Sequence, residues 1–281
     1  MNKVTSITIL LLVGAASAAD KSHYNLFNPT PREHMREMVT DRPDKTEAPY
    51  TVDAGHYQIE MDVFTYVVDR YNGIAGDHRS EALAIAPINL KAGLLNNVDL
   101  QLIVQPYVSL REHNVAAAAV DERRGFGDVM PRLKVNLWGN DGGATALALM
   151  PYVKLPTNTD HVGNNSVEGG LIVPFAVALP QEISLGLMTQ LDIAHDESGD
   201  GHHPEFVNSI TLGRAIAGDL SGFVEFFSSV SAESRSEWIG TFDVGLTYMV
   251  TDDIQLDAGV FIGLTRAADD INPFLGVSWR F

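Results

Sequence analysis

The chain ends in the stretch FLGVSWRF, residues 274–281. Successive side chains of a strand point to opposite faces, so Leu275, Val277, Trp279 and Phe281 share one face, opposite small or polar residues. A soluble domain gains no stability from a terminal strand that exposes Trp and Phe to water. In a bilayer such a strand suits a closed barrel, with its aromatic end at the membrane interface. The stretch therefore predicts the closing strand of a transmembrane β-barrel.

The N-terminus has the three parts of a secretory signal peptide. Lys3 supplies a positive charge, residues 4–13 are apolar, and Ala16-Ser17-Ala18 forms a cleavage motif. The apolar run is too short to span a bilayer comfortably. We predict a cleaved signal peptide over residues 1–18, and hence export.

Composition narrows the class of the exported chain. Removal of residues 1–18 leaves 18 basic and 36 acidic residues, and such an acidic surface repels nucleic acid. The 281-residue chain has no cysteine, so it is stable without disulfides. No other apolar run has the length of a transmembrane helix; residues 171–179 come nearest and are broken by Pro174. The apolar side chains must fill a soluble core or face lipid strand by strand.

From His56 onward, hydrophobicity alternates with a period of two. The clearest case is residues 98–111, where even positions are apolar and odd positions are mostly polar. A count of ~12 strands results, an even number that is typical of bacterial single-chain barrels. The predicted strands cover residues 57–63, 81–94, 98–111, 128–137, 144–156, 168–179, 183–193, 205–217, 220–231, 238–250, 254–265 and 274–281.

The connections alternate between long and short, as in outer-membrane barrels with extracellular loops and periplasmic turns. The long connections are residues 71–80, 112–124, 156–167, 195–204, 231–237 and 266–272. The short ones are residues 95–97, 139–143, 180–181, 218–219 and 251–253. Both ends of the barrel-forming sequence then lie on the turn side, where the first and last strands can pair.

Aromatic spacing agrees with a bilayer. Trp238 and Tyr248 are ten residues apart on the outward face of one predicted strand. That separation corresponds to ~25 Å of height, the thickness of the apolar band between aromatic girdles. Trp138 falls on the predicted inward face near a turn. The fold class predicted is all-β: an antiparallel up-and-down barrel of ~12 strands.

Residues 19–54 form a separate polar zone. Residues 31–38 can make about two helical turns, and the charged stretch that follows is hostile to helices. Two interpretations stay open: a periplasmic tail, or a segment in the lumen that acts as a plug. The candidate plug residues are Arg42, Asp44, Lys45 and Glu47. We divide the chain into a signal peptide (1–18), this segment (19–54) and the barrel (55–281).

The inward face of the predicted barrel is mixed in charge and contains aromatic rings. The candidate pore-lining residues are Glu60, Asp62, Gln101, Gln105, Tyr107, Arg111, Arg132, Lys134, Tyr152, Lys154, Arg214, Phe223, Glu225, Phe227, Asp243, Asp257 and Arg280. The charges either tune what passes through a lumen or neutralise one another across strands. The rings either contact an apolar or aromatic solute or pack on the N-terminal segment.

The sequence gives little indication of a catalytic or metal-binding site. The loop at residues 195–203 gathers three His and three acidic residues, but its spacing fits neither a zinc site nor an EF-hand. There is no G-x-S-x-G and no H-E-x-x-H motif. We predict no catalytic residue, no metal site and no cofactor.

Several stretches together resemble a known family. The block Asp41-Arg42-Pro43-Asp44-Lys45-Thr46-Glu47, the segment Gly125–Asp128, and Asn272-Pro273 before the Phe-ended strand are similar to proteobacterial outer-membrane proteins of the phenol-degradation meta-pathway type. The resemblance covers the mature chain. It implies passage of small solutes, aromatic compounds among the candidates, across the outer membrane.

Our leading hypothesis is thus an outer-membrane channel or transporter for small solutes. The alternatives are a lipid-modifying esterase barrel, for which no Ser–His pair appears on a lipid-facing strand, and a structural or adhesive barrel. The partners expected are outer-membrane lipid, a small-molecule solute, and the barrel assembly machinery acting on the strand that ends at Phe281; nucleic acid is not expected.

Overall fold

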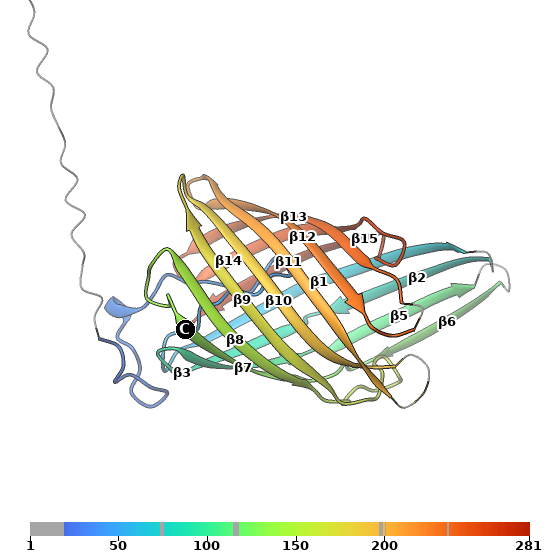
Figure 1. Cartoon of the computed structure of the whole chain (residues 1–281), viewed down its shortest axis with the longest axis horizontal. Coiled ribbons are helices and arrows are strands. Elements are labelled where there is room, and N and C mark those ends of the chain that lie inside the picture. Colours follow the sequence, from blue (N-terminus) through green and yellow to red (C-terminus); the bar gives the residue numbers. More distant parts are fainter. Residues whose placement is uncertain (1–19, 74–75, 115–117, 197–198, 200, 235) are drawn as a thin grey trace, which may run out of the picture.

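The computed structural model describes residues 20–73, 76–114, 118–196, 199, 201–234 and 236–281 (Figure 1). The predicted signal peptide, residues 1–18, lies outside this part of the chain. None of the described helices is long and apolar enough to cross a membrane. Where two helical turns were expected, the chain forms only the short 3₁₀ helix η1 (Arg32–His34), and extended backbone at Met35 ends it.

From Tyr57 onward, the described chain forms a single antiparallel sheet of fifteen strands. They are β1 (Tyr57–Gly73), β2 (Gly76–Ile85), β3 (Ile88–Leu95), β4 (Val98–Val104), β5 (Tyr107–Asn114), β6 (Ala119–Gly125), β7 (Met130–Trp138), β8 (Thr145–Lys154), β9 (Glu168–Leu179), β10 (Ile183–His195), β11 (His202–Ala217), β12 (Leu220–Ser231), β13 (Ile239–Thr251), β14 (Ile254–Gly263) and β15 (Ile271–Arg280).

These fifteen segments make twelve barrel strands. β2 and β3 are two halves of one strand, separated by Ala86 and Pro87, and both halves pair with β1. In the same way β4 continues into β5 and β6 continues into β7. Because β15 also pairs with β1, the sheet closes on itself. The predicted twelve-stranded up-and-down barrel is confirmed.

The C-terminal stretch closes the barrel as its alternation predicts. The backbone N–H of Tyr57 donates to the carbonyl of Phe281 at 3.0 Å, and the N–H of Phe281 donates back at 2.9 Å. The two rings stack with centroids 5.9 Å apart. The register then runs from Gln58 opposite Arg280 through β1 and β15. The first and last strands therefore meet at the end of the barrel that also holds the N-terminal segment (Figure 1).

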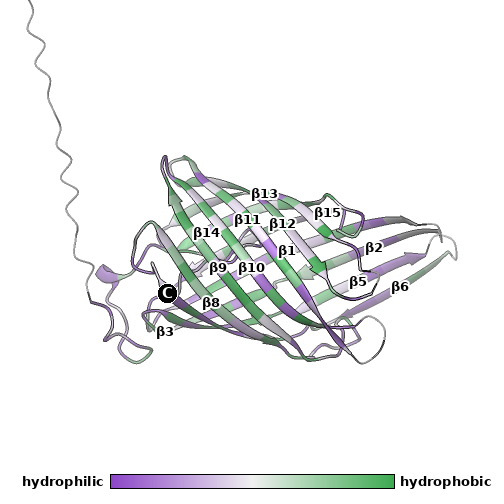
Figure 2. Ribbon diagram, viewed as in Figure 1, coloured by the Kyte–Doolittle hydropathy of each residue, from purple (hydrophilic) through white to green (hydrophobic). Residues whose placement is uncertain are grey.

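The large apolar side chains of the strands are mostly exposed on the outer face of the barrel. Figure 2 shows hydrophobic and hydrophilic residues interspersed along the strands. In β4, Leu100 and Leu102 are exposed, whereas Asp99 and Gln101 between them are fully buried. This inversion of the usual burial pattern is what lipid outside and a packed polar interior require. Trp238 is exposed on this outer side too, as predicted. The prediction that Trp138 faces inward is wrong, because a bulge between Asn136 and Trp138 turns its ring outward.

The rim opposite the two termini differs from the prediction. Residues 71–80 and 112–124 were expected to be loops, but β1 and β2 extend to Gly73 and Gly76, and β5 and β6 extend to Asn114 and Ala119. The sequence did not predict these strand extensions because their residues are largely polar and form no apolar face. Their backbone N–H and carbonyl groups pair with one another all the same. They continue well past the other strands as a four-stranded projection (Figure 1).

Candidate functional site

The chain's own N-terminal segment contacts side chains on the inner face of the barrel. Just before η1, the N–H of Thr30 donates to the carbonyl of Ala54, which lies shortly before β1. Residues 41–52 then make hydrogen bonds or ion pairs with side chains of the barrel wall. We call these residues the luminal segment. Their wall partners lie on strands β1, β3, β4, β7, β11, β12, β13 and β14.

Asp41 is a buried, charged residue of the luminal segment. Its carboxylate contacts the ammonium groups of Lys91 and Lys134, and its backbone N–H donates to Glu60 at 3.1 Å. Lys134 is fully buried. Burial would raise the pKa of Asp41, but the two lysines overcome it and hold that pKa well below its usual range. A buried lysine needs a carboxylate in this position, so the cluster ties the luminal segment to β3 and β7.

Two cations of the luminal segment pair with further strands of the wall. Arg42 forms ion pairs of 2.7 Å with Asp62 on β1 and with Asp257 on β14. A Cβ placed on Gly276 would lie 2.1 Å from an Arg42 nitrogen. Glycine at this position of β15 is therefore what allows the guanidinium to lie against the strand.

Lys45 extends the contact to β12, β13 and β14. Its ammonium lies 3.2 Å from Asp243 and donates to the Thr241 hydroxyl at 2.8 Å. The same ammonium sits 4.6 Å from the ring centre of Phe227 and 4.4 Å from that of Phe261. Cation–π attraction between an ammonium and two desolvated rings adds to the ion pair. The inward aromatic rings therefore contact the luminal segment in this structure.

The acidic residues of the luminal segment differ in whether a cation lies beside them. Glu47 pairs with Arg132 on β7, while the N–H groups of Lys45 and Thr46 donate to Glu225 at 2.9 and 2.8 Å. Asp44 has no ion-pair partner among the described residues, and burial raises its pKa to about 7, with Glu47 adding to the rise. Burial also raises the pKa of Glu47, against the pull of Arg132. These two carboxyl groups are the titratable weak points of the segment.

Most of the sequence-predicted lining residues do face the interior. Buried or half-buried side chains on the face opposite the exposed apolar residues are Glu60, Asp62, Gln101, Arg132, Lys134, Tyr152, Lys154, Phe223, Glu225, Phe227, Asp243, Asp257 and Arg280. Gln105 lies in the break between β4 and β5, against Gly127. Of the candidate plug residues, Arg42, Lys45 and Glu47 form ion pairs with the wall.

Three residues are corrected by the strand register. Tyr107 pairs with Ile85 and Arg111 pairs with Glu81, on the outward face of the sheet that Ile85 exposes. The alternation switches phase at Gln105-Pro106, so the even-position rule for residues 98–111 fails in its second half. Arg214 pairs with Gly222, in the register opposite to the inward pair Gly213 and Phe223.

Sequence reasoning missed Lys91, which binds both Asp41 and Glu60. The alternation of the strand could have predicted an inward Lys91, because Lys91 lies two residues after Asn89 and follows the exposed Leu90 in β3. It missed Asp53 for a different reason. Asp53 precedes the barrel, and its contact with Lys21, at 3.4 Å, depends on how the N-terminal segment folds back.

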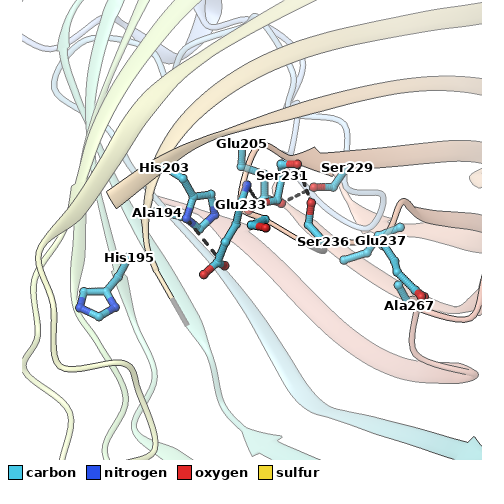
Figure 3. A pocket seen from close by; sticks show the side chains of 12 residues that line it. Ala194, His195, His203, Glu205, Ser229, Ser231, Glu233, Ser236, Glu237 and Ala267 are labelled. Carbon is cyan, nitrogen blue, oxygen red and sulfur yellow. Dashed lines mark hydrogen bonds and ion pairs between the residues drawn. The ribbon is translucent and has the colours of Figure 1, made fainter. Parts of the chain in front are cut away.

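The opposite mouth of the lumen is open and acidic. A cavity of about 560 Å³ is lined by His203, Glu205, Glu233 and Glu237 together with several serines (Figure 3). His203 lies 2.8 Å from Asp196 and 3.9 Å from Glu233. The ligand atoms of this trio fall within 4.8 Å of one another, a spacing that a metal ion could bridge. Residues 197, 198 and 200 of the same loop lie outside the described chain.

Comparisons with known proteins agree with this architecture. Residues 40–281 match the family model described as "Putative MetA-pathway of phenol degradation". The COG4313 outer membrane channel from Pseudomonas putida F1 shares the fold with a TM-score of 0.65 at 12% identity, covering 86% of this chain and 100% of that one. The transport unit of the autotransporter AIDA-I from Escherichia coli follows, with a TM-score of 0.52, 11% identity, and coverage of 87% and 93%. No curated protein matches by sequence.

Proposed function

Because the chain belongs to the MetA-pathway family of phenol degradation, we propose that it is an outer-membrane channel for small solutes, aromatic compounds among them, closed by its luminal segment. The closed twelve-stranded barrel with an apolar outer face supports the location. The similar fold of the Pseudomonas putida outer membrane channel supports the transport class.

One observation supports the proposal that the luminal segment closes the channel. The luminal segment bonds to strands on opposite sides of the wall, from Lys134 on β7 to Asp257 on β14. A chain anchored on both sides must cross the space between them. Its anchors are ion pairs and hydrogen bonds rather than apolar packing, and the wall residues alone would leave buried charges unpaired. We therefore assign residues 41–52 the role of a plug that can leave when its charges are otherwise satisfied.

The aromatic wall supports the choice of solute. Phe227 and Phe261 lie on the inner face, and Lys45 covers both rings in the closed state. Departure of Lys45 would expose two aromatic rings beside Thr241 and Asp243. Such a surface stacks with a planar ring and accepts a hydrogen bond from its hydroxyl. Phenolic compounds have that combination.

Export, membrane insertion and domain division complete the proposal. Residues 1–18 act as the cleaved signal, residues 19–54 as the regulatory segment and residues 55–281 as the barrel. The exposed aromatic residues contact outer-membrane lipid. The barrel assembly machinery receives the strand that ends at Phe281, since that strand pairs with β1 to close the barrel.

The decisive experiment compares planar-bilayer conductance of the refolded mature chain with that of a variant lacking residues 20–54. We expect larger and longer openings from the variant, because the lumen then loses its occupant. Heat-modifiable gel mobility shows whether each protein has folded. A folded deletion variant with no conductance would overturn the channel, whereas equal conductance of the two proteins would overturn only the plug.

A second experiment tests the solute class in liposomes. Uptake of phenol and of a sugar of similar mass is measured through the deletion variant and through the same variant with Phe227→Ala and Phe261→Ala. Loss of the two rings should reduce phenol uptake more than sugar uptake. Equal reductions would mean that the rings do not select the solute.

A further inference from the structure

The four-stranded projection formed by β1, β2, β5 and β6 sorts its charges between its two faces. The register places Arg70, Arg79, Arg111 and Arg124 on the face that continues the lipid-facing side of the barrel, with Glu81 and Glu122 between them. The opposite face carries Asp69, Glu112, Asp121 and Arg123. Counting only residues with described side chains, the outward face is net positive and the inward face net negative. The whole chain has a charge of −17, so this segregation needs an explanation.

The outward arginines begin where the apolar surface stops. On β1 the side chains of this face run Phe64, Tyr66, Val68, which is buried, and then Arg70. On β2 the order toward the tip is Ile85, Leu83, Glu81 and Arg79. Phe64 and Ile85 are exposed members of the lipid-facing band. A step from apolar and tyrosine side chains to arginine marks the level of lipid headgroups.

The arginine side chains are accessible and only partly paired. Arg111 donates to Glu122 at 3.1 Å and lies 4.0 Å from Glu81, while its side chain is 42% exposed. Arg79 and Arg124 also pair with these two glutamates and stay exposed. Within the described chain, the Nε atoms of Arg79 and Arg111 and the Nε2 atom of His113 have no hydrogen-bond partner, but these atoms are buried. Two glutamates thus organise three guanidinium groups whose side chains remain partly exposed.

We propose that this outward face, defined by Arg79, Arg111 and Arg124, binds the phosphate groups of the phosphorylated glycolipid in the outer leaflet. Guanidinium groups grip phosphate by paired N–H donors, and a cluster of them recognises a polyanionic headgroup. The acyl chains of the same molecule would lie on the apolar band below, beside Ile85 and Leu83. A free phosphate ion has no use for that apolar surface, which is why we choose the lipid.

The test uses the full refolded chain in detergent without divalent cations, which also bind these phosphates. Purified lipopolysaccharide, enzymatically dephosphorylated lipopolysaccharide and inorganic phosphate are the three probes. We expect saturable binding of the first, at least ~10-fold weaker binding of the second, and weakening by added salt. Equal binding of the first two probes would overturn the proposal. Binding of inorganic phosphate with the affinity of the lipid would replace it with a simple anion site.

Variants locate the surface. R79Q, R111Q and R124Q combined should weaken lipopolysaccharide binding at least ~10-fold, whereas R123Q on the opposite face should leave it within twofold. Conversely, E81Q combined with E122Q should strengthen binding, because the guanidinium groups lose their competing carboxylates. This gain cannot result from misfolding, and heat-modifiable mobility checks all variants. An unchanged affinity in the folded triple variant, or a loss with the two glutamate variants, would contradict the proposal.

Discussion

The two ends of the lumen use charge in different ways. At the end near the termini, Asp41, Lys91 and Lys134 are buried and bonded to one another. At the other end, His203, Glu205, Glu233 and Glu237 surround an open cavity of about 560 Å³ (Figure 3). Buried charges are costly to leave alone and strongly coupled, whereas exposed ones are screened by water and salt. If the luminal segment is the plug we propose, we expect closure to be decided at the buried end and the open mouth only to bias what enters.

The largest expected effect comes from breaking the buried cluster. Lys134→Met removes one of the two lysines that pair with Asp41 and should destabilise the protein by about 3–5 kcal/mol, the usual cost of removing one partner of a buried pair. Part of that loss should appear as release of the luminal segment. Urea unfolding in lipid vesicles measures the stability, and channel openings in planar bilayers report the release.

Lys154→Met is the matched control for that variant. Lys154 is also an inward lysine paired with a carboxylate, Glu168, but it lies toward the open mouth and is 22% exposed. We expect a change within about 1 kcal/mol and no new openings, because partly solvated ion pairs contribute little. Equal effects of the two substitutions would show that the two ends of the lumen do not differ in this way.

The next effect in size is a pH dependence of closure. Asp44 has an ordinary pKa of 3.8 when released and about 7 in the closed state, where Asp41, Glu47 and Glu225 surround it. The raised pKa means that the closed state prefers the protonated carboxyl, so closure weakens as pH rises from about 4 to 7 and stays weakened above it. Glu47 acts in the same direction. Asp41, with its pKa lowered, loses its stabilising charge only at more acidic pH.

Open probability in planar bilayers should therefore be higher at pH 8 than at pH 5. Asp44→Asn should remove most of this dependence and keep the channel closed at pH 8, since an amide resembles the protonated carboxyl. Glu122→Gln, on the outer face of the projection, serves as the control and should leave the pH profile intact. More frequent opening at pH 5 than at pH 8 would reverse the sign and refute the assignment to Asp44.

The contrast between the two ends also explains what sequence could predict. Alternation over residues 98–104 revealed both the barrel and the inward positions of Asp99 and Gln101, because a period of two is a local property. Phase switches at the bulge between Asp62 and Phe64 and at Gln105-Pro106 are not visible in composition, so Tyr107 and Arg111 were misplaced.

The luminal network was harder to predict. Arg42 finds Asp257 across 215 residues of sequence, a pairing that only the closed barrel brings about. The sequence did identify Arg42 and Lys45 as candidate plug residues, because they lie in a charged stretch without a helical or strand pattern. It left open whether those partners were wall residues or water. Alternation states which face a residue occupies, but it gives no information on what fills the lumen.

The smallest expected effect concerns the open mouth. In the variant lacking residues 20–54, the acidic lining formed by Glu205, Glu233 and Glu237 should favour cations over anions. Glu237 is exposed, so Glu237→Gln should reduce the cation preference only modestly, and less at high salt, because screening shortens its reach. Reversal potentials across a potassium chloride gradient measure the preference at two salt concentrations. Glu122→Gln faces away from the lumen and should not alter the potential. A large, salt-independent change at Glu237 would mean that the mouth, rather than the buried end, controls what passes.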